Sequence, residues 1–303
     1  MTYDIGYEKK SDSVSLFAWH ECNNFGDKVG PALFHDIVKR PVYVEARGLS
    51  LIFHEGRPRT IYCFLGTLAH HLYGPHHFVF WGFGIAPQEG PAHHGCKPMQ
   101  EGLDIEFRAL RGPLTHQELL KKNYLVPSNI PYGDPALLIP YFYHRSPEQS
   151  SEYCLVPHHT QYSEWRKRFP KEKVIDIGIN SYDKIQDLIT ELTSYKVIFS
   201  ASLHVTILAE SFGIPVKPVE PPLSFKFDDF YQSVNKKIDY LMHIPPDTDF
   251  QNLAIETTSH WRPIQWDPEP WLTASPFPLN QNMISRLRKH YLTLANLSRP
   301  FEG

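Results

Sequence analysis

Residues 196–215 read KVIFSASLHVTILAESFGIP and predict a strand, a tight turn and a helix in direct succession. The apolar run 197–199 is bounded by polar residues, as in a buried strand of a parallel sheet. Small residues then break the run, and Ser202 is suited to cap the helix that follows. Gly213 and Pro215 end that helix. Glycine favours the left-handed conformation at a helix C-terminus, and proline cannot continue the helix. The stretch is therefore the repeating unit of an α/β fold.

The start of the predicted helix is also a predicted anion site. Its first turn contains Leu203 and His204, directly after Ser202. The N–H groups of a first helical turn have no partner within the helix, and the helix dipole favours anions there. Ligands of α/β proteins bind at this end of the strands. The alternative interpretation is a capped helix with a surface histidine.

The same strand and helix pattern recurs in both halves of the chain. The expected strands cover residues 14–19, 60–65, 78–81 and 105–110 in the first half, and 153–157, 173–177, 197–199 and 216–219 in the second. Segments whose apolar residues have helical spacing lie between several of these strands, so each sheet should be parallel and doubly wound. We expect two Rossmann-like domains whose strand ends face one another across a cleft.

The polar run PEQSS at 147–151 marks the expected boundary between these domains. The N-terminal domain would cover residues 1–146, on the acceptor side, and the C-terminal domain residues 147–243, on the donor side. Residues 244–303 are expected to pack back on both domains. They begin with a proline-rich, extended wrapping segment and end in a helix over 279–297.

Charge and cysteine usage exclude several classes of protein. The 30 basic and 33 acidic residues give a net charge of −3, which argues against bulk nucleic-acid binding. The 4 cysteines have no CxxC spacing, so a zinc ribbon or a disulfide scaffold is not expected. No apolar run is long enough to span a membrane, and we expect a cytoplasmic protein. The basic C-terminal helix would either dock on the protein or contact anionic lipids at the inner face of the membrane.

Four pairs of adjacent histidines raise the question of a metal. They are His70-His71, His76-His77, His93-His94 and His158-His159. Adjacent residues point to different faces of a helix or strand, so one pair rarely supplies two ligands. The chain has neither HExxH nor a zinc-like His and Cys spacing. We therefore expect no metal.

Two loops of the first half carry further candidate residues. Asn24, Phe25, Gly26 and Asp27 lie between the first strand and the first helix, where Asp27 either only caps the helix or acts on a substrate. Gly84 ends a GxG after the strand 78–81, which permits close approach of a ligand to the backbone or forms a plain turn.

Cations and a histidine follow other strands. Arg111 ends the strand 105–110 and would hold a carboxylate or phosphate, unless it is a surface arginine. Lys226 follows the last strand, and His158 follows the first strand of the second half. All three would lie near the carboxyl ends of the strands.

Several segments taken together, over about residues 14–231, resemble the polysaccharide pyruvyl transferase family. The matching segments, in the order of that family, are 24–27 with Gly30-Pro31, 65–68, 81–84, 111–115, 133–136, Pro157-His158, 202–204, 213–215 and 226–231. The resemblance implies a glycosyltransferase-B-like fold. It also implies phosphoenolpyruvate as co-substrate, without a bound cofactor, and a saccharide acceptor that is often lipid-linked, in the synthesis of a surface polysaccharide.

The resemblance also implies roles for the candidate residues. His204 would protonate the donor, Asp27 would be the base or orient the acceptor, and His158 would be a second acid–base group. The donor would be held by Arg111, Ser202, Leu203 and Lys226, and the acceptor by Asn24, Phe25, Gly26 and Gly84. Some members of the family carry arginine directly before Leu-His, where this chain has Ser202. The donor phosphate must then be held by other cations and by the helix N-terminus.

Fold does not determine function, so two alternatives stay open. One is a glycosyltransferase that uses a sugar nucleotide on the same scaffold. The other is a non-catalytic protein that binds saccharides.

Overall fold

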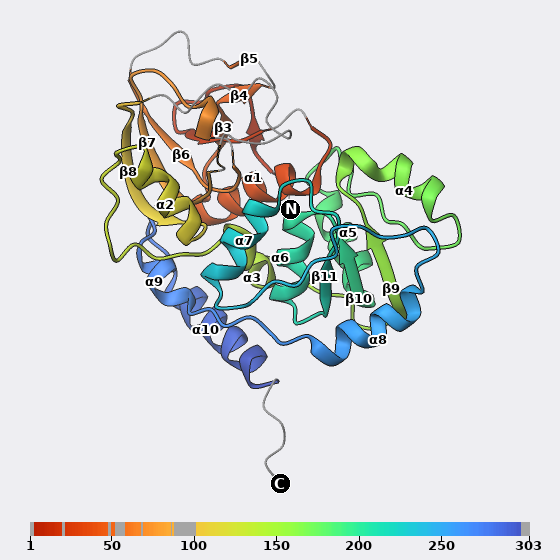
Figure 1. Cartoon of the computed structure of the whole chain (residues 1–303). Helices are drawn as coiled ribbons and strands as arrows, with labels where there is room; N and C mark the ends of the chain where they lie inside the picture. The colour runs from red at the N-terminus through yellow and green to blue at the C-terminus, as the bar shows by residue number, and fades with distance from the viewer. Residues whose placement is uncertain are drawn as a thin grey trace.

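The computed structural model describes residues 3–19, 22–47, 50–51, 58–67, 69–85, 87 and 101–297. In these residues the chain is a mixed α/β structure with two parallel sheets, as the sequence predicted (Figure 1). A short antiparallel pair, β4 (Ala46–Arg47) and β5 (Ser50–Leu51), lies beside the first sheet.

The first sheet has six strands in the order β1-β3-β2-β6-β7-β8. These are β1 (Ile5–Gly6), β2 (Val14–Phe17), β3 (Val42–Val44), β6 (Thr60–Cys63), β7 (His77–Phe83) and β8 (Asp104–Leu110). The chain leaves β2 for β3 on one side and later returns to β6 on the other side. The strand order therefore reverses between β2 and β6, and ligands of open α/β sheets bind at such a point.

The second sheet has three strands in the order β11-β10-β9. They are β9 (Ser151–Val156), β10 (Tyr195–Ser200) and β11 (Val216–Pro218). The strand expected over 173–177 was wrong, because this segment forms only a bridge between Leu155 and Val174. A turn follows immediately, in which the Asp176 carboxylate accepts a hydrogen bond from Gly178 N–H at 2.8 Å. This turn takes the backbone away from the sheet.

Ten α-helices occur among the described residues. They are α1 (Phe25–Val38), α2 (Pro113–Lys121), α3 (Ile139–Phe142), α4 (Tyr162–Arg168), α5 (Lys184–Thr193), α6 (Leu203–Ser211), α7 (Ser224–Ser233), α8 (Phe250–His260), α9 (Pro268–Thr273) and α10 (Gln281–Asn296). Short 3-10 turns cover Ala69–His71, Pro135–Leu138 and His159–Gln161.

One hydrophobic core connects the two halves. Its buried side chains include Val14 and Trp81 of the first sheet together with Val156, Ile198 and Val216 of the second. Apolar burial of this kind is the main stabilising contribution to a fold. The domain boundary at 146–147 and the glycosyltransferase-B-like arrangement stay predictions.

The proline-rich segment 245–278 is not simply extended, as the sequence suggested, because it contains α8 and α9 (Figure 1). The carboxylates of Asp249 and Asp267 cap these two helices. Pro268 stands in the first turn of α9, where its missing N–H costs no helical hydrogen bond. Trp271 of α9 stacks on Trp81 of β7, with ring centroids 4.6 Å apart.

Helix α10 docks on the protein through one face, where Met283, Leu287, Tyr291 and Leu294 are buried. The Arg286 guanidinium lies 5.0 Å from the ring centroid of Tyr141. Contact of this helix with lipid stays a prediction. Among the described residues, no helix combines the length and the apolar character needed to cross a membrane.

Candidate active site

A cavity of about 380 Å³ lies at the carboxyl ends of strands from both sheets. Its first wall follows β2 and β6, at the point where the strand order of the first sheet reverses. Its second wall follows β9 and β10. The lining residues are Ala18, Trp19, Cys22, Asn24, Gly26, Asp27, Pro31, Leu65, Gly66, Thr67, His71, His158, His159, Ser202, Leu203, His204 and Lys226.

Two helix N-termini contribute to this cavity. Helix α6 begins after Ser202, as predicted, but the Ser202 side chain makes no capping hydrogen bond. Helix α1 begins after Asn24, so the prediction of Asp27 as its cap was wrong, because Asp27 lies inside the first turn. The Asn24 side-chain amide donates to Asp27 Oδ2 at 3.0 Å. Within the described part of the chain, no hydrogen bond reaches the N–H groups of Leu203 and His204. Such N–H groups and the helix dipole favour an anion.

His204 lies directly against α1, and Gly26 makes this contact possible. A Cβ atom placed on Gly26 would lie 2.1 Å from His204 Nδ1. Only glycine leaves room for the imidazole at this distance. The contact joins the helix after β2 to the helix after β10 and brings His204 and Asp27 into the same cavity. An acceptor-binding role for Gly26 stays a prediction.

Lys226 in the cavity and Arg111 behind its wall give it a positive potential, which disfavours a charge on the neighbouring histidines. Burial, with the nearby charges of Lys226, Arg111 and His158, lowers the pKa of His204 to about 3. Burial, with His159 and Lys226, lowers the pKa of His158 to about 3. Burial and the Arg111 charge lower the pKa of Lys226 to about 8, although Asp27 acts in the opposite direction. The lowered pKa values mean that positive charge on these side chains is disfavoured in the empty cavity. An anion that enters the cavity would therefore be attracted.

Asp27 is the carboxylate among the cavity-lining residues. Burial raises its pKa to about 6, while the Asn24 amide and the charges of Lys226 and Lys28 act against this rise. A pKa near the working pH suits a group that accepts and releases a proton.

Arg111 lies behind the cavity wall and is only 1% exposed. Its Nε donates to Asp229 Oδ2 at 2.9 Å, and its Nη1 donates to Thr67 Oγ1 at 2.7 Å. The Asp229 carboxylate also accepts from Thr115 N–H at 2.9 Å, which caps α2. Arg111 therefore fastens α7 to the first sheet. It affects the cavity through its charge and through Thr67, and a direct contact with the donor stays a prediction.

Two other predicted residues are also absent from the cavity lining. Phe25 is fully buried in the core. Gly84 makes room for Arg111, because a Cβ atom there would lie 2.3 Å from the Arg111 Cζ atom. The structure thus brings together the other predicted residues but not these two or Arg111. Their contact with an acceptor stays a prediction.

An aromatic pair in the cavity wall was missed from the sequence. The rings of Trp19 and His71 have centroids 5.5 Å apart, and Trp19 Nε1 donates to Cys22 Sγ at 2.9 Å. Trp19 lies two residues beyond the end of β2, a position that could have marked it. His71 carried no such signal.

A metal site is not evident in the described ranges. No group of three or more His, Cys, Asp or Glu side chains there could hold a metal ion. His93 and His94 lie outside the described residues.

Comparison with known proteins confirms the resemblance for the middle of the chain. Residues 78–220 match the family model of polysaccharide pyruvyl transferase. By its description, the matched family consists of transferases. The matched region includes His158 and His204 but ends before Lys226 and begins after Asp27. Leu68, in another of the matching segments, lies outside the described residues.

Two individual proteins are also similar to parts of the chain. Over 114 residues it is 33% identical to the uncharacterized protein L143 of Acanthamoeba polyphaga mimivirus. The aligned region covers 34% of this chain and 39% of that relative. A crystal structure of an uncharacterized Klebsiella pneumoniae protein aligns with a TM-score of 0.42 at 16% identity, over 72% of this chain and 87% of the other.

Proposed function

We propose that this protein transfers the pyruvyl group of phosphoenolpyruvate to two hydroxyls of one saccharide unit, with release of phosphate. The acceptor would belong to a surface polysaccharide or to its lipid-linked precursor. One observation carries the proposal. Lys226, His158 and His204 share a cavity with two helix N-termini and with Asp27. This arrangement suits an anionic donor whose reaction needs an acid and a base.

Phosphoenolpyruvate carries a phosphate and a carboxylate, and both need positive partners. The Lys226 ammonium and the N–H groups of Leu203 and His204 can provide them from one wall of the cavity. These groups would supply the positive partners for the donor phosphate that Ser202, which carries no charge, does not supply. Arg111 adds positive potential from behind Thr67.

His204 is the proposed proton donor, and donor binding would charge it. Its pKa of about 3 leaves the imidazole neutral in the empty cavity. A bound phosphate and carboxylate oppose the charges of Lys226 and Arg111, so they raise the pKa of His204. The acid is then active only when the donor is present.

The first chemical step forms one C–O bond. Asp27 takes the proton of a sugar hydroxyl as its oxygen bonds to C2 of phosphoenolpyruvate, and the His204 proton moves to C3, which becomes a methyl group. The bond between C2 and the phosphate oxygen then breaks. A second hydroxyl of the same sugar adds to C2 and closes the ketal. Its proton leaves with the phosphate, and His158 is suited to transfer it. The first hydroxyl proton is left on Asp27 and must return to His204 to replace the proton given to C3, whereas the second hydroxyl proton leaves on phosphate.

The aromatic pair in the opposite wall supports the acceptor side of the proposal. Trp19 and His71 present partly exposed rings to the cavity. A sugar ring has an apolar C–H face, which packs well on an aromatic surface. Acceptor and donor would then meet between this aromatic pair and the opposite wall, which carries Lys226 and the N-terminus of α6.

The direct experiment measures phosphate release from phosphoenolpyruvate with a panel of saccharides, followed by mass analysis of the product. We expect phosphate release that depends on an acceptor, and a product that carries one added pyruvyl group. A sugar-nucleotide transferase would instead show a thermal shift with UDP or GDP and none with phosphoenolpyruvate. Saccharide binding without phosphate release would point to a non-catalytic protein.

A further inference from the structure

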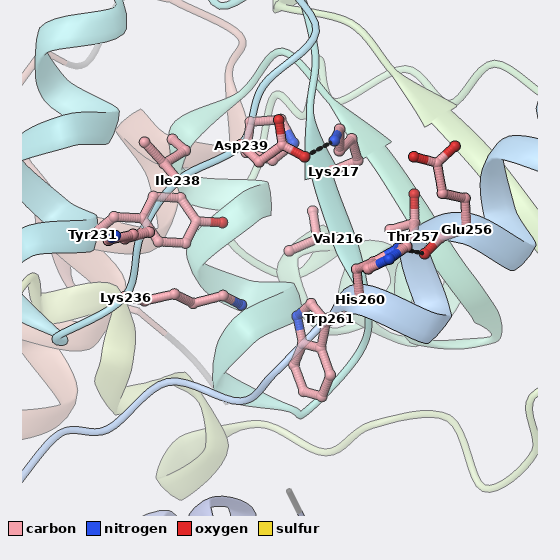
Figure 2. Close-up of a pocket in the computed structure, with 12 residues that line it drawn as sticks. Val216, Lys217, Tyr231, Lys236, Ile238, Asp239, Glu256, Thr257, His260 and Trp261 are labelled. Carbon is pink, nitrogen blue, oxygen red and sulfur yellow. Dashed lines mark hydrogen bonds and ion pairs between the residues drawn. The ribbon is translucent and has the colours of Figure 1, made fainter.

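A second cavity, of about 370 Å³, lies at the edge strand β11 between α7 and α8 (Figure 2). It shares no lining residue with the first cavity. Val216 and Lys217 come from β11, Tyr231 from α7, and Glu256 from α8. Its volume falls in the range of roughly 300–1,000 Å³ that is typical of small-molecule sites.

The centre of this cavity is an ordered cluster of aromatic and charged side chains. Lys236 Nζ lies 4.8 Å from the ring centroid of Trp261 and 5.7 Å from that of Tyr231. The same ammonium bonds at 2.6 Å to Glu210 Oε1, which also accepts the Tyr231 hydroxyl at 2.8 Å. Glu210 is fully buried, so it holds these groups from behind. Figure 2 shows Lys236 and the Tyr231 hydroxyl directed towards the middle of the cavity, with Trp261 below them.

Positive and negative groups are balanced here, in contrast to the first cavity. The lining contains three lysines, which are Lys217, Lys236 and Lys237, and two carboxylates, Asp239 and Glu256. A third carboxylate, Glu210, pairs with Lys236 from behind. Lys217 and Asp239 form an ion pair. A phosphate or carboxylate would therefore meet no excess positive charge. The lining favours a neutral ligand that both donates and accepts hydrogen bonds.

We infer that this second cavity binds a neutral saccharide. Sugar hydroxyls can donate to the carboxylates of Asp239 and Glu256 and accept from the neighbouring ammonium groups. The apolar face of the sugar can pack on the Trp261 indole. A site of this kind would hold part of a glycan at a distance from the first cavity, which raises the overall affinity for a long chain.

The test measures binding of neutral mono- and disaccharides of glucose, galactose, mannose and N-acetylglucosamine by ligand-observed NMR on the full chain. At least one member of the panel should bind, and salt should leave its affinity nearly unchanged. Trp261→Leu should weaken binding about two- to tenfold, whereas Trp261→Phe keeps an aromatic ring and most of the affinity. Asp239→Asn should weaken binding roughly tenfold.

Two controls keep the outcome unambiguous. Glu152→Gln removes the carboxylate of an exposed ion pair with Lys196, which does not line this cavity, and should leave binding unchanged. His204→Ala should also leave this binding unchanged, so loss of pyruvyl transfer and loss of saccharide binding are separate results. Asp239 is 84% exposed, so its variant should fold even if Trp261→Leu does not.

Three results would overturn the inference. The first is that no saccharide of the panel binds to the wild-type protein. The second is that binding is unchanged in both Trp261→Leu and Asp239→Asn, which would place it elsewhere. The third is that inorganic phosphate displaces the sugar from this cavity, with affinity that falls steeply as salt is added.

Discussion

Replacing Gly26 by alanine should remove most activity without unfolding the protein. The new Cβ atom would lie 2.1 Å from His204 Nδ1, whereas ordinary contact begins at 3.4 Å, so the imidazole must move by about 1.3 Å. Displacing a catalytic group by about 1 Å costs roughly 10²-fold in rate. Alanine is also favoured over glycine inside a helix by about 1 kcal/mol, which offsets part of the steric cost.

The assay is steady-state phosphate release, combined with thermal unfolding and with NMR of the His204 imidazole. We expect a roughly 100-fold loss of kcat/KM, a changed imidazole chemical shift and nearly unchanged thermal stability. Gly6→Ala is the open-space control, because no atom lies within 4 Å of a Cβ atom there. Gly30→Ala adds the same methyl group to the same helix, but its first contact is Leu65 Cβ at 3.0 Å, so its effect should be smaller. Full activity together with an unshifted His204 in Gly26→Ala would refute the reasoning.

Three further predictions concern the proposed proton donor His204, the ion pair of Arg111 with Asp229, and the pH profile. His204→Ala should lose about 10²–10⁴-fold in pyruvyl transfer while the fold, followed by circular dichroism, is retained; near wild-type ketal formation would contradict its role. Asp229→Ala should lower the free energy of unfolding by about 3–5 kcal/mol, measured by urea titration, because it leaves buried Arg111 unpaired; a loss below about 1 kcal/mol would show that the pair is unimportant. The pH profile of kcat/KM should be bell-shaped. Asp27, with a pKa of about 6, becomes a base as the pH rises past 6, and Lys226, with a pKa of about 8, loses its charge above pH 8. In Asp27→Asn the fall in rate at low pH should disappear, and a profile that keeps this fall would exclude Asp27 as the base.

Local pattern was sufficient to predict the units of the fold. The stretch 196–215 contains a strand, a cap and a helix stop within one window, and β10 and α6 form there. The same rule places His158 and His204 at one edge of the second sheet and Asp27 at the corresponding edge of the first, because the carboxyl ends of parallel strands meet at one edge of a sheet. Bringing the two edges together depends on long-range contacts such as that of Gly26 with His204.

Long-range contacts explain what the sequence could not predict. The partner of Arg111 is Asp229, 118 positions along the chain, and nothing near either residue indicates the pair. The segment 173–177 looked like a strand, but the turn at Asp176 ends its pairing after one bridge. Helices α8 and α9 were not predicted, because the prolines around them indicated an extended segment. Asp249 and Asp267 are nevertheless ordinary helix caps.

The ion pair between Arg111 and Asp229 has a consequence for engineering the protein. Asp229 lies on α7, the helix that also carries Lys226, whereas Arg111 and the capped helix α2 belong to the first half of the chain. A chimera that takes its second half from a relative would import the donor-side lysine without the arginine that anchors its helix. Functional chimeras should therefore exchange residues 111–115 together with α7, so that the lysine keeps its position over the cavity.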